Sequence, residues 1–442
     1  MSKTNRRRPP ISTHEGGKAR RINPGQQLRR SVMSCMLWER EFYEDGVSIA
    51  ERIAQLVPKC NADEVQAIAI EARENMKLRH APLWIVHAMA ACQGDHRLLV
   101  ADTLSRVIQR ADELTEFVSL YWLNGKRPLS AQVKKGLARA FPKFTAHQLA
   151  KYNRDGEVKL RDVLFLCHAK PKDEGQAETW RELVDGVLSA PDTWEVALSD
   201  NTSELSPRQK WERLLQEDKL GALALLRNLR NMGQAEVNPK LVKAALAKLD
   251  TKWVLPFRFI TAARHNVKLE PELESCLFRC VEERPKLDGR TVLLVDVSQS
   301  MEWPLSGRTE LNRMDAACGL TMLARELCEE CEVWTFSNNL VQVPARRGFA
   351  LRDAVVGSQR HGGTALGGAL KRLLTETGVP HRLIVVTDEQ TNDRLPGIPA
   401  ECRAYMLNVA SAQNGVGYGD WIHMDGFSEA VLDYILEVEK EG

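Results

Sequence analysis

The sequence lacks the features that mark exported, membrane-bound and disulfide-stabilised proteins. Nowhere do about 18 apolar residues follow one another, as a membrane-spanning helix requires, and no apolar core follows the basic N-terminus MSKTNRRRPP as it would in a secretory signal. The ten cysteines are scattered, so we expect reduced thiols and no disulfide framework. These absences predict a cytoplasmic protein with no membrane partner.

Motifs of the common enzyme classes are missing as well. The chain has no Gly-x-x-x-x-Gly-Lys phosphate loop, no Ser/His/Asp hydrolase arrangement and no paired-carboxylate pattern of a metal hydrolase. Cys328 and Cys331 have the spacing of zinc ligands, but no second pair lies nearby in the sequence. We interpret them as structural thiols. The sequence therefore predicts a binding protein and no catalytic residues.

What the chain does contain is apolar material for several domains and an uneven distribution of charge. Of its 442 residues, 43% are hydrophobic, which is enough for two or more cores. Residues 1–286 carry ten more Lys and Arg than Asp and Glu, and residues 287–442 carry eight fewer. The basic part suggests a polyanionic partner. A helical domain with a solvated basic surface explains the same excess.

Two parts precede Leu287. Residues 1–25 are rich in Lys, Arg, Pro and Gly, which predicts a flexible basic arm. Over residues 26–286 the apolar positions recur at helical spacing, so we predict short helices stacked in antiparallel pairs as an α-solenoid. The helix start signals are Asn61 with Glu64, Pro82, Ser130, Thr145 with Gln148, Ser206 with Pro207, and Asn238 with Pro239.

The pattern of apolar residues changes at Leu287. Continuous apolar runs now alternate with helical stretches, which predicts a doubly wound, mostly parallel sheet in a second domain over residues 287–442. The expected fold class is therefore an all-α repeat domain followed by an α/β domain. The predicted strands are TVLLVDVS (291–298), CEVWTFS (331–337), HRLIVVTDE (381–389) and RAYMLNVA (403–410), and the predicted helices cover about 312–330, 365–376 and 427–439.

Oxygen-bearing side chains stand where such a sheet gathers its ligands, at the carboxyl ends of the strands. Asp296, Ser298 and Ser300 end the first predicted strand, Thr364 follows a glycine-rich loop, and Asp388 ends a later strand. Taken singly, Thr364 is explained as a helix cap and Asp388 as an ordinary strand-end acid. In this order on these elements, the five residues predict a site for Mg²⁺ or Mn²⁺, because few carboxylates among hydroxyl oxygens suit those ions better than zinc.

This combination resembles the metal-ion-dependent adhesion site of von Willebrand factor A domains, over roughly residues 288–442. The resemblance implies that the Asp and the two Ser bind the cation directly, and that the Thr or the last Asp binds it directly or through water. It also implies a vacant coordination position that accepts an acidic group from a partner.

Segments of the helical part resemble TROVE-domain proteins, the Ro-type ribonucleoproteins. The resemblance implies a monomeric ring of HEAT-like repeats, closed by the A-type domain. Such a ring binds small structured Y-type RNAs on its outer surface and single-stranded ends of misfolded RNAs in its central hole. An exoribonuclease such as polynucleotide phosphorylase is an implied partner. The segments are MLWEREFYEDG (36–46), EARENMKLRHAPLW (71–84), KY…CHAKP (151–171), GALALLRNLRNMG (221–233) and LPFRFITA (255–262).

Three groups of cations suit the phosphates of such an RNA, because each gathers several positive charges on one helix face or loop. The resemblance implies Y RNA contacts for the second group and places the third at the hole. The groups are Lys126, Arg127, Lys134, Lys135 and Arg139; Lys151, Arg154, Arg161, His168 and Lys170; and Lys77, Arg79 and His80.

Each group also has a simpler explanation. Lys134 and Lys135 are explained as a solvated face, His168 as a buried hydrogen-bonded histidine, and Arg79 as a charge at a turn. Asp155 is acidic where relatives can be basic, which weakens the expectation of Y RNA binding. The alternative function is a protein-interaction adaptor, in which the metal site holds an acidic partner residue and the helices serve only as a platform.

Overall fold

The structure is a computed structural model that describes most of the chain. It describes residues 23–33, 46–76, 78–188, 194–199, 204–251, 254, 257–282, 284–305, 311–391, 393–410, 415–417, 420–425, 432, 435, 436 and 439. The chain divides into two compact units. We call Ala50–Leu220 with Ala235–Asn238 the helical unit, and Met1–Ile49, Gly221–Gln234 and Pro239–Gly442 the sheet unit.

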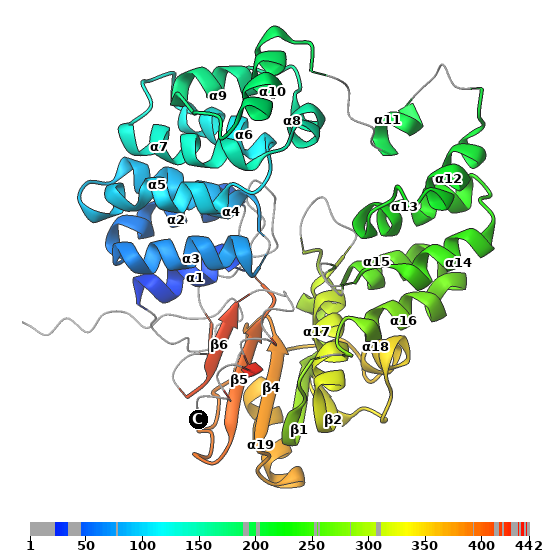
Figure 1. Cartoon of the computed structure of the whole chain (residues 1–442). Helices are drawn as coiled ribbons and strands as arrows, with labels where there is room; N and C mark the ends of the chain where they lie inside the picture. The colour runs from blue at the N-terminus through cyan, green and yellow to red at the C-terminus, as the bar shows by residue number, and fades with distance from the viewer. Residues whose placement is uncertain are drawn as a thin grey trace, which may run out of the picture. The chain divides into compact units, whose positions relative to one another are not determined.

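The helical unit is a stack of short helices. Helices α3, α5, α7 and α9 pack one after another, and α4 and α6 pack beside them, as Figure 1 shows. The alternation buries one apolar stripe of each helix against the next, as expected for a solenoid. Its helices are α2 (Gly46–Leu56, which begins just before the unit), α3 (Ala62–Glu74), α4 (His80–Ala91), α5 (Asp95–Val107), α6 (Asp112–Tyr121), α7 (Ala131–Ala140), α8 (Ala146–Tyr152), α9 (Leu160–Cys167), α10 (Glu174–Asp185), α11 (Trp194–Ser199) and α12 (Pro207–Gln216).

The predicted start signals begin these helices. The Asn61 side chain accepts hydrogen bonds from the amides of Asp63 and Glu64, at 2.9 and 3.4 Å, and so caps α3. Full capping boxes open α8 at Thr145 and α12 at Ser206. These caps satisfy amide groups that the first helical turn leaves without a partner.

The sheet unit contains a six-stranded sheet in the order β3-β2-β1-β4-β5-β6. All neighbouring strands run parallel except β2 and β3, which are antiparallel. The order reverses beside β1, so the loops after β1 and β4 open toward each other. The strands are β1 (Leu287–Asp296), β2 (Cys328–Phe336), β3 (Leu340–Gln342), β4 (Arg382–Thr387), β5 (Arg403–Asn408) and β6 (Ile422–Asp425).

Both faces of this sheet are covered, which explains the continuous apolar runs of its strands. Val292 and Leu294 of β1 pack in one core with Leu370 and Leu373 of α19 (Leu366–Thr377). The intervening residues of β1 are equally buried, and α17 (Arg313–Leu327) packs against β1, β2 and β4. A further helix, α18 (Gly348–Val356), packs against α17.

Five helices outside the α/β segment also belong to the sheet unit. They are α1 (Pro24–Met33), α13 (Ala222–Gln234), α14 (Pro239–Lys248), α15 (Phe257–His265) and α16 (Glu270–Arg279).

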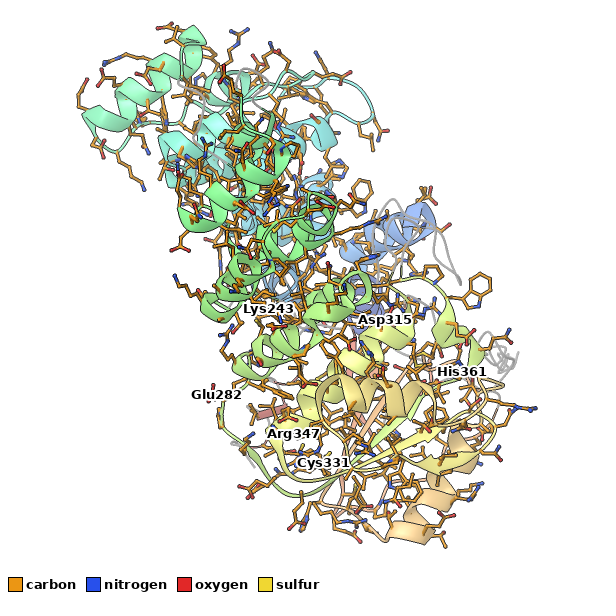
Figure 2. All side chains as sticks on the ribbon, turned by 90° about the vertical axis from the view of Figure 1, so that its right-hand side faces the viewer. Lys243, Glu282, Asp315, Cys331, Arg347 and His361 are labelled. Carbon is orange, nitrogen blue, oxygen red and sulfur yellow. The ribbon has the colours of Figure 1, made fainter. Side chains whose placement is uncertain are left out.

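Ion pairs and ring contacts join α15 and α16 to the α/β segment. Arg264 of α15 lies 2.8 Å from Asp315 of α17, and Arg347 lies over the Phe278 ring of α16 at 4.9 Å; Figure 2 labels Asp315 and Arg347. The last helices before β1 therefore pack against α17 and α18 of the α/β segment.

The structure confirms the predicted fold class of helical repeats followed by a doubly wound α/β domain. The first strand begins at Leu287, and before it the described residues contain helices and turns but no strand. Strands β3 and β6 and helix α18 were not predicted, since each is short or weakly patterned. The domain limits 1–25, 26–286 and 287–442 stay predictions, and most of the arm and of the predicted helix 427–439 lies outside the described residues. No described helix is long and apolar enough to span a bilayer.

Candidate metal centre and nucleic-acid interface

The loops that carry the five predicted metal-site residues are hydrogen-bonded to one another at the carboxyl ends of β1 and β4. The Gln299 amide donates to the Gly362 carbonyl at 2.9 Å, which joins the first loop to the glycine-rich second loop. The Thr391 hydroxyl donates to the Thr364 carbonyl at 2.8 Å, which joins the second loop to the third. These bonds bring Asp296, Ser298, Ser300, Thr364 and Asp388 to one end of the sheet.

Asp296 is fully buried and held on both carboxylate oxygens. Oδ1 accepts from the Ser298 amide at 2.8 Å, and Oδ2 accepts from the Thr387 hydroxyl at 2.6 Å. The hydroxyl oxygens of Ser298 and Ser300 lie 3.2 Å apart, so both point into the same small space. Burial and the negative charge of Asp388 raise the pKa of Asp296 to about 7.

The donor chemistry fits a hard divalent cation. Asp296 and Asp388 are both inaccessible to solvent, and burial together with repulsion by the negative charge of Asp388 raises the pKa of Asp296. A cation held between them would relieve that repulsion, and the adjoining hydroxyl oxygens are ligands that Mg²⁺ accepts. Within the described ranges, His, Cys, Asp and Glu form no cluster of three or more that could hold a metal ion. The hydroxyl and carboxylate oxygens of the five predicted residues suit an oxygen-ligated ion better than zinc.

Two residues of this site were missed in the sequence. Thr387 directly precedes Asp388, and its side chain fixes Asp296 from the neighbouring strand; its place at a strand end was a usable signal. Arg313, at the start of α17, is buried, and its Nη1 lies 3.5 Å from Oδ2 of Asp388. No local pattern connects residues 75 positions apart, so Arg313 was not predictable.

His361 connects two of the loops that carry the predicted metal-site residues. Figure 2 labels this residue, which belongs to the glycine-rich loop. Its Nδ1 is hydrogen-bonded to Glu302 of the first loop, and its Nε2 lies 3.0 Å from the Val356 carbonyl. The contact is a second direct link between the first two metal-site loops.

A basic surface lies in the helical unit. Residues 117–154 contain eight Lys and Arg and no Asp or Glu. Lys135 and Arg139 are exposed one turn apart on α7, and Lys134 is half-buried beside them. The two cations of the preceding loop lie over aromatic rings, Lys126 over Trp122 at 5.7 Å and Arg127 over Tyr121 at 4.4 Å. The first predicted group is therefore a set of cations without neighbouring carboxylates in its own segment.

The second predicted group follows α8 and α9. Lys151 lies in the last turn of α8, and the other four residues are exposed in the next loop, on α9 and in the turn after it. His168 ends α9 with a left-handed backbone, φ 54°, and is exposed, so it is not the buried histidine of the simpler explanation. Asp155 forms an ion pair with Lys159 at 2.7 Å, which balances its charge within the loop. The other four residues are Arg154, Arg161, His168 and Lys170.

The third predicted group is less available to a phosphate. Lys77 lies outside the described residues, and His80 is exposed at the first turn of α4. Arg79 pairs with Asp112 at 2.7 Å and with Glu116, and lies 3.7 Å from Glu113. Three carboxylates thus surround its guanidinium group, which makes Arg79 part of an internal network.

Comparisons with known proteins agree with this architecture. Residues 186–305 match the model of the TROVE domain family. Among solved structures, the Ro (Rsr) protein of Deinococcus radiodurans matches with a TM-score of 0.60 and 16% identity, over 94% of this chain and 100% of that one. The comparison with curated protein sequences gave no match. The two findings confirm the resemblance to Ro-type TROVE proteins, while the A-type identity of the sheet domain stays a prediction.

Proposed function

We propose that this chain, a Ro-type protein by its TROVE segment and its fold, is an RNA-binding ribonucleoprotein scaffold. The observation that carries the proposal is the acid-free segment 117–154, which folds into α7, α8 and their connections with its cations at the surface. A segment with eight Lys and Arg and no Asp or Glu suits an RNA backbone, because Lys and Arg side chains neutralise phosphates and position the RNA.

The spread of cations over this surface and the resemblance support one class of RNA as the ligand. Cations spread over two helices and two loops fit a folded RNA that presents several phosphates at once. We therefore propose a small structured RNA of the Y type as the main ligand, with single-stranded ends of misfolded RNAs as a second one. An exoribonuclease such as polynucleotide phosphorylase is the protein partner that we propose. In this function the chain binds and positions RNA in the cytoplasm and catalyses no reaction.

The experiment compares the salt dependence of RNA binding in two triple variants. Lys151→Ala, Arg154→Ala and Lys170→Ala remove three cations of the second group. Arg181→Ala, Arg208→Ala and Arg372→Ala remove the same charge from sites where each cation already pairs with a carboxylate, at 3.1, 2.9 and 2.9 Å. With a structured RNA, the first variant should flatten the plot of log affinity against log salt by about one unit per lost contact. The control should flatten it much less.

The outcomes separate three readings. Equal losses in both variants would mean that only net charge matters. An unchanged slope in the first variant, with its circular dichroism spectrum intact, would mean that the second group is a solvated face. Wild-type protein that binds no RNA at low salt would favour the adaptor function.

We further propose that the site at the carboxyl ends of β1 and β4 binds Mg²⁺ or Mn²⁺. Asp296, Ser298 and Ser300 would hold the ion directly, and Thr364 and Asp388 would hold it directly or through water. When bound, the ion supplies a positive charge with an open position for an acidic group.

One feature favours the adaptor function as the second candidate. Trp303 follows the first metal-site loop and is 45% exposed. An exposed tryptophan beside a proposed cation site suits a protein partner that brings both an acidic and an apolar group. Isolation of a protein that binds only with Mn²⁺ present, and not to Trp303→Ala, would support this function.

A further inference from the structure

Glu389, the residue directly after Asp388, is completely buried although the metal-site prediction gives it no role. Its Oε1 lies 3.0 Å from Nη1 of Arg30 and is also bonded to Nε2 of His423. Its Oε2 accepts a hydrogen bond from the Gly417 amide at 2.8 Å. Both carboxylate oxygens are therefore engaged by groups outside the loop that carries Asp388.

These partners come from distant parts of the sequence. Arg30 lies on α1, only 1% exposed, and is 359 positions before Glu389; α1 packs against β6, which carries His423. Nη1 of Arg30 also lies 3.1 Å from Nε2 of His423. Figure 1 shows α1, in blue, near β6, in red. The guanidinium, imidazole and carboxylate groups form a buried triad that connects the first described helix to the last described strand.

The surroundings leave little freedom to this triad. A β-carbon at position 415 would overlap the Glu389 carboxylate and the Arg30 guanidinium, so a larger residue there would displace the triad. The Glu389 backbone has φ 58°, in the left-handed region that side chains other than glycine rarely adopt. A residue in such a conformation persists because its surroundings hold it.

The triad reaches both buried carboxylates of the proposed metal site. Glu389 follows Asp388 directly, so the two residues share a peptide bond. Because the Glu389 backbone is held in place, the position of Asp388 is restricted as well. The Glu389 amide also donates to the Thr387 hydroxyl at 3.1 Å, and that hydroxyl donates to Oδ2 of Asp296 at 2.6 Å. A chain of direct contacts therefore runs from Arg30 to Asp296.

We propose that Arg30 is a positioning residue for the metal site, so that docking of α1 and cation binding support each other. The inference depends on the metal site proposed above. Partners of metal ligands orient those ligands, and their loss weakens metal binding by about 10- to 100-fold. Coupling of two binding events is reciprocal, so bound cation must in turn stabilise the docked α1.

The test measures Mn²⁺ affinity by calorimetry in two variants that each remove a buried arginine from the sheet unit. Arg30→Met removes the triad cation at the carboxyl end of β4. Arg382→Met removes a cation at the amino end of the same strand, where Arg382 pairs with Glu439 and the side chains are 3% and 7% exposed. Both variants should lose stability, but only Arg30→Met should weaken Mn²⁺ binding, by about tenfold or more. Arg30→Lys should restore part of the affinity.

A second measurement serves if Arg30→Met does not fold. Gly415→Ala presses on the same triad and should weaken Mn²⁺ binding while Arg30 is still present. In the wild-type protein, Mn²⁺ should slow hydrogen exchange of the α1 amides, and Asp296→Ala should remove that protection.

The failure of this inference is distinct from the failure of the metal site. If the wild-type protein binds no Mn²⁺, the proposed metal site itself is wrong. Wild-type affinity in a folded Arg30→Met variant, or an equal loss in Arg382→Met, leaves the site in place and overturns the role of Arg30.

Discussion

In the helical unit, most cations of the proposed RNA surface are exposed to water, whereas in the sheet unit the carboxylates at the carboxyl ends of β1 and β4 are buried. Lys135 and Arg139 are exposed on α7. Asp296, Asp388 and Glu389 have no exposed surface at all. The two placements fit the two different ligands that we propose, a large polyanion for the helical unit and a small cation for the sheet unit.

The difference has a physical cause. An exposed cation keeps most of its hydration and needs no partner, so it remains available to a phosphate. A buried charge has to be balanced within the protein. Although burial alone would raise its pKa, Arg30 and His423 hold the pKa of Glu389 at about 2. For Asp296, burial and the negative charge of Asp388 raise the pKa instead.

The largest effect that we expect is the loss of cation binding in Asp296→Ala with Ser298→Ala. The pair removes a formal charge and a neutral oxygen donor from one coordination shell, so calorimetry should detect no Mn²⁺ binding. RNA affinity should stay at the wild-type value. If RNA affinity falls together with metal affinity, the proposal that the two units bind their ligands independently is wrong.

A matched control removes the same residue types from the solvent-accessible side of a helix in the helical unit. Asp102→Ala with Ser105→Ala lies on α5, where both side chains are solvent-accessible and distant in sequence from the metal-site loops. This variant should bind Mn²⁺ as wild type does. Undiminished affinity in the metal-site variant would place the cation elsewhere.

The second prediction concerns one buried ion pair of the helical unit, which departs from its exposed pattern. Arg73 at the end of α3 lies 2.6 Å from Glu113 of α6, with side chains 8% and 0% exposed. Its other nitrogens donate to the carbonyls of Val107 and Leu78, at 2.9 and 3.1 Å. Arg73→Met should lower the free energy of unfolding by about 3–5 kcal/mol, because it leaves a buried carboxylate without its main partner.

Chemical denaturation measures this loss, and a double variant checks its cause. Arg73→Met combined with Glu113→Gln should be more stable than Arg73→Met alone, since the second change removes the uncompensated charge. Additive losses would show that the ion pair is not the source. Exposed cations such as Lys135 should change the stability by no more than about 0.5 kcal/mol on replacement.

Features that depend on neighbouring residues could be predicted from the sequence, whereas the buried contacts between distant residues could not. Local periodicity encodes the helices and the main strands, and residue types at helix starts encode the caps. The caps Thr145 and Ser206 and the strand after Leu287 could therefore be predicted from the sequence. Asp296 and Asp388 were predicted as metal-site residues because the carboxyl end of a parallel strand is a known ligand position, and their role stays a prediction. Arg313 and Arg30 were missed, because each meets its carboxylate across a long sequence separation that only the fold brings together.

The third prediction tests how closely the buried face of α7, opposite its exposed cations, packs against α5. A β-carbon at Gly136 would lie 2.9 Å from Cβ of Leu104 and 3.0 Å from the Ala101 carbonyl oxygen of α5. Gly136→Ala should therefore lower the free energy of unfolding by about 1–3 kcal/mol, despite the better helix propensity of alanine. Gly175→Ala, on exposed α10 with its nearest atom at 3.5 Å, is the control and should be neutral or stabilising. Equal effects would mean that α5 and α7 do not approach so closely.

The smallest predicted effect concerns the cap of α8, the helix that carries Lys151. The Thr145 hydroxyl accepts a hydrogen bond from the Gln148 amide at 3.3 Å, and the Gln148 side chain accepts one from the Thr145 amide at 3.0 Å. Thr145→Ala removes the first of these bonds and should destabilise this seven-residue helix by about 1 kcal/mol. Hydrogen exchange of the α8 amides should become faster, while Thr145→Ser should keep the wild-type rate.

RNA binding of Thr145→Ala relates this loss of order to the function of the helical unit. If Lys151 contributes only its exposed charge, loosening α8 should lower the affinity for structured RNA less than Lys151→Ala does, and the salt slope should stay the same. Fraying of the helix leaves the positive charge in place, whereas removal of the lysine removes a counterion that binding would release. A flatter slope in Thr145→Ala would show that the cation needs the ordered helix, and the helical unit would then position its charges as strictly as the sheet unit does.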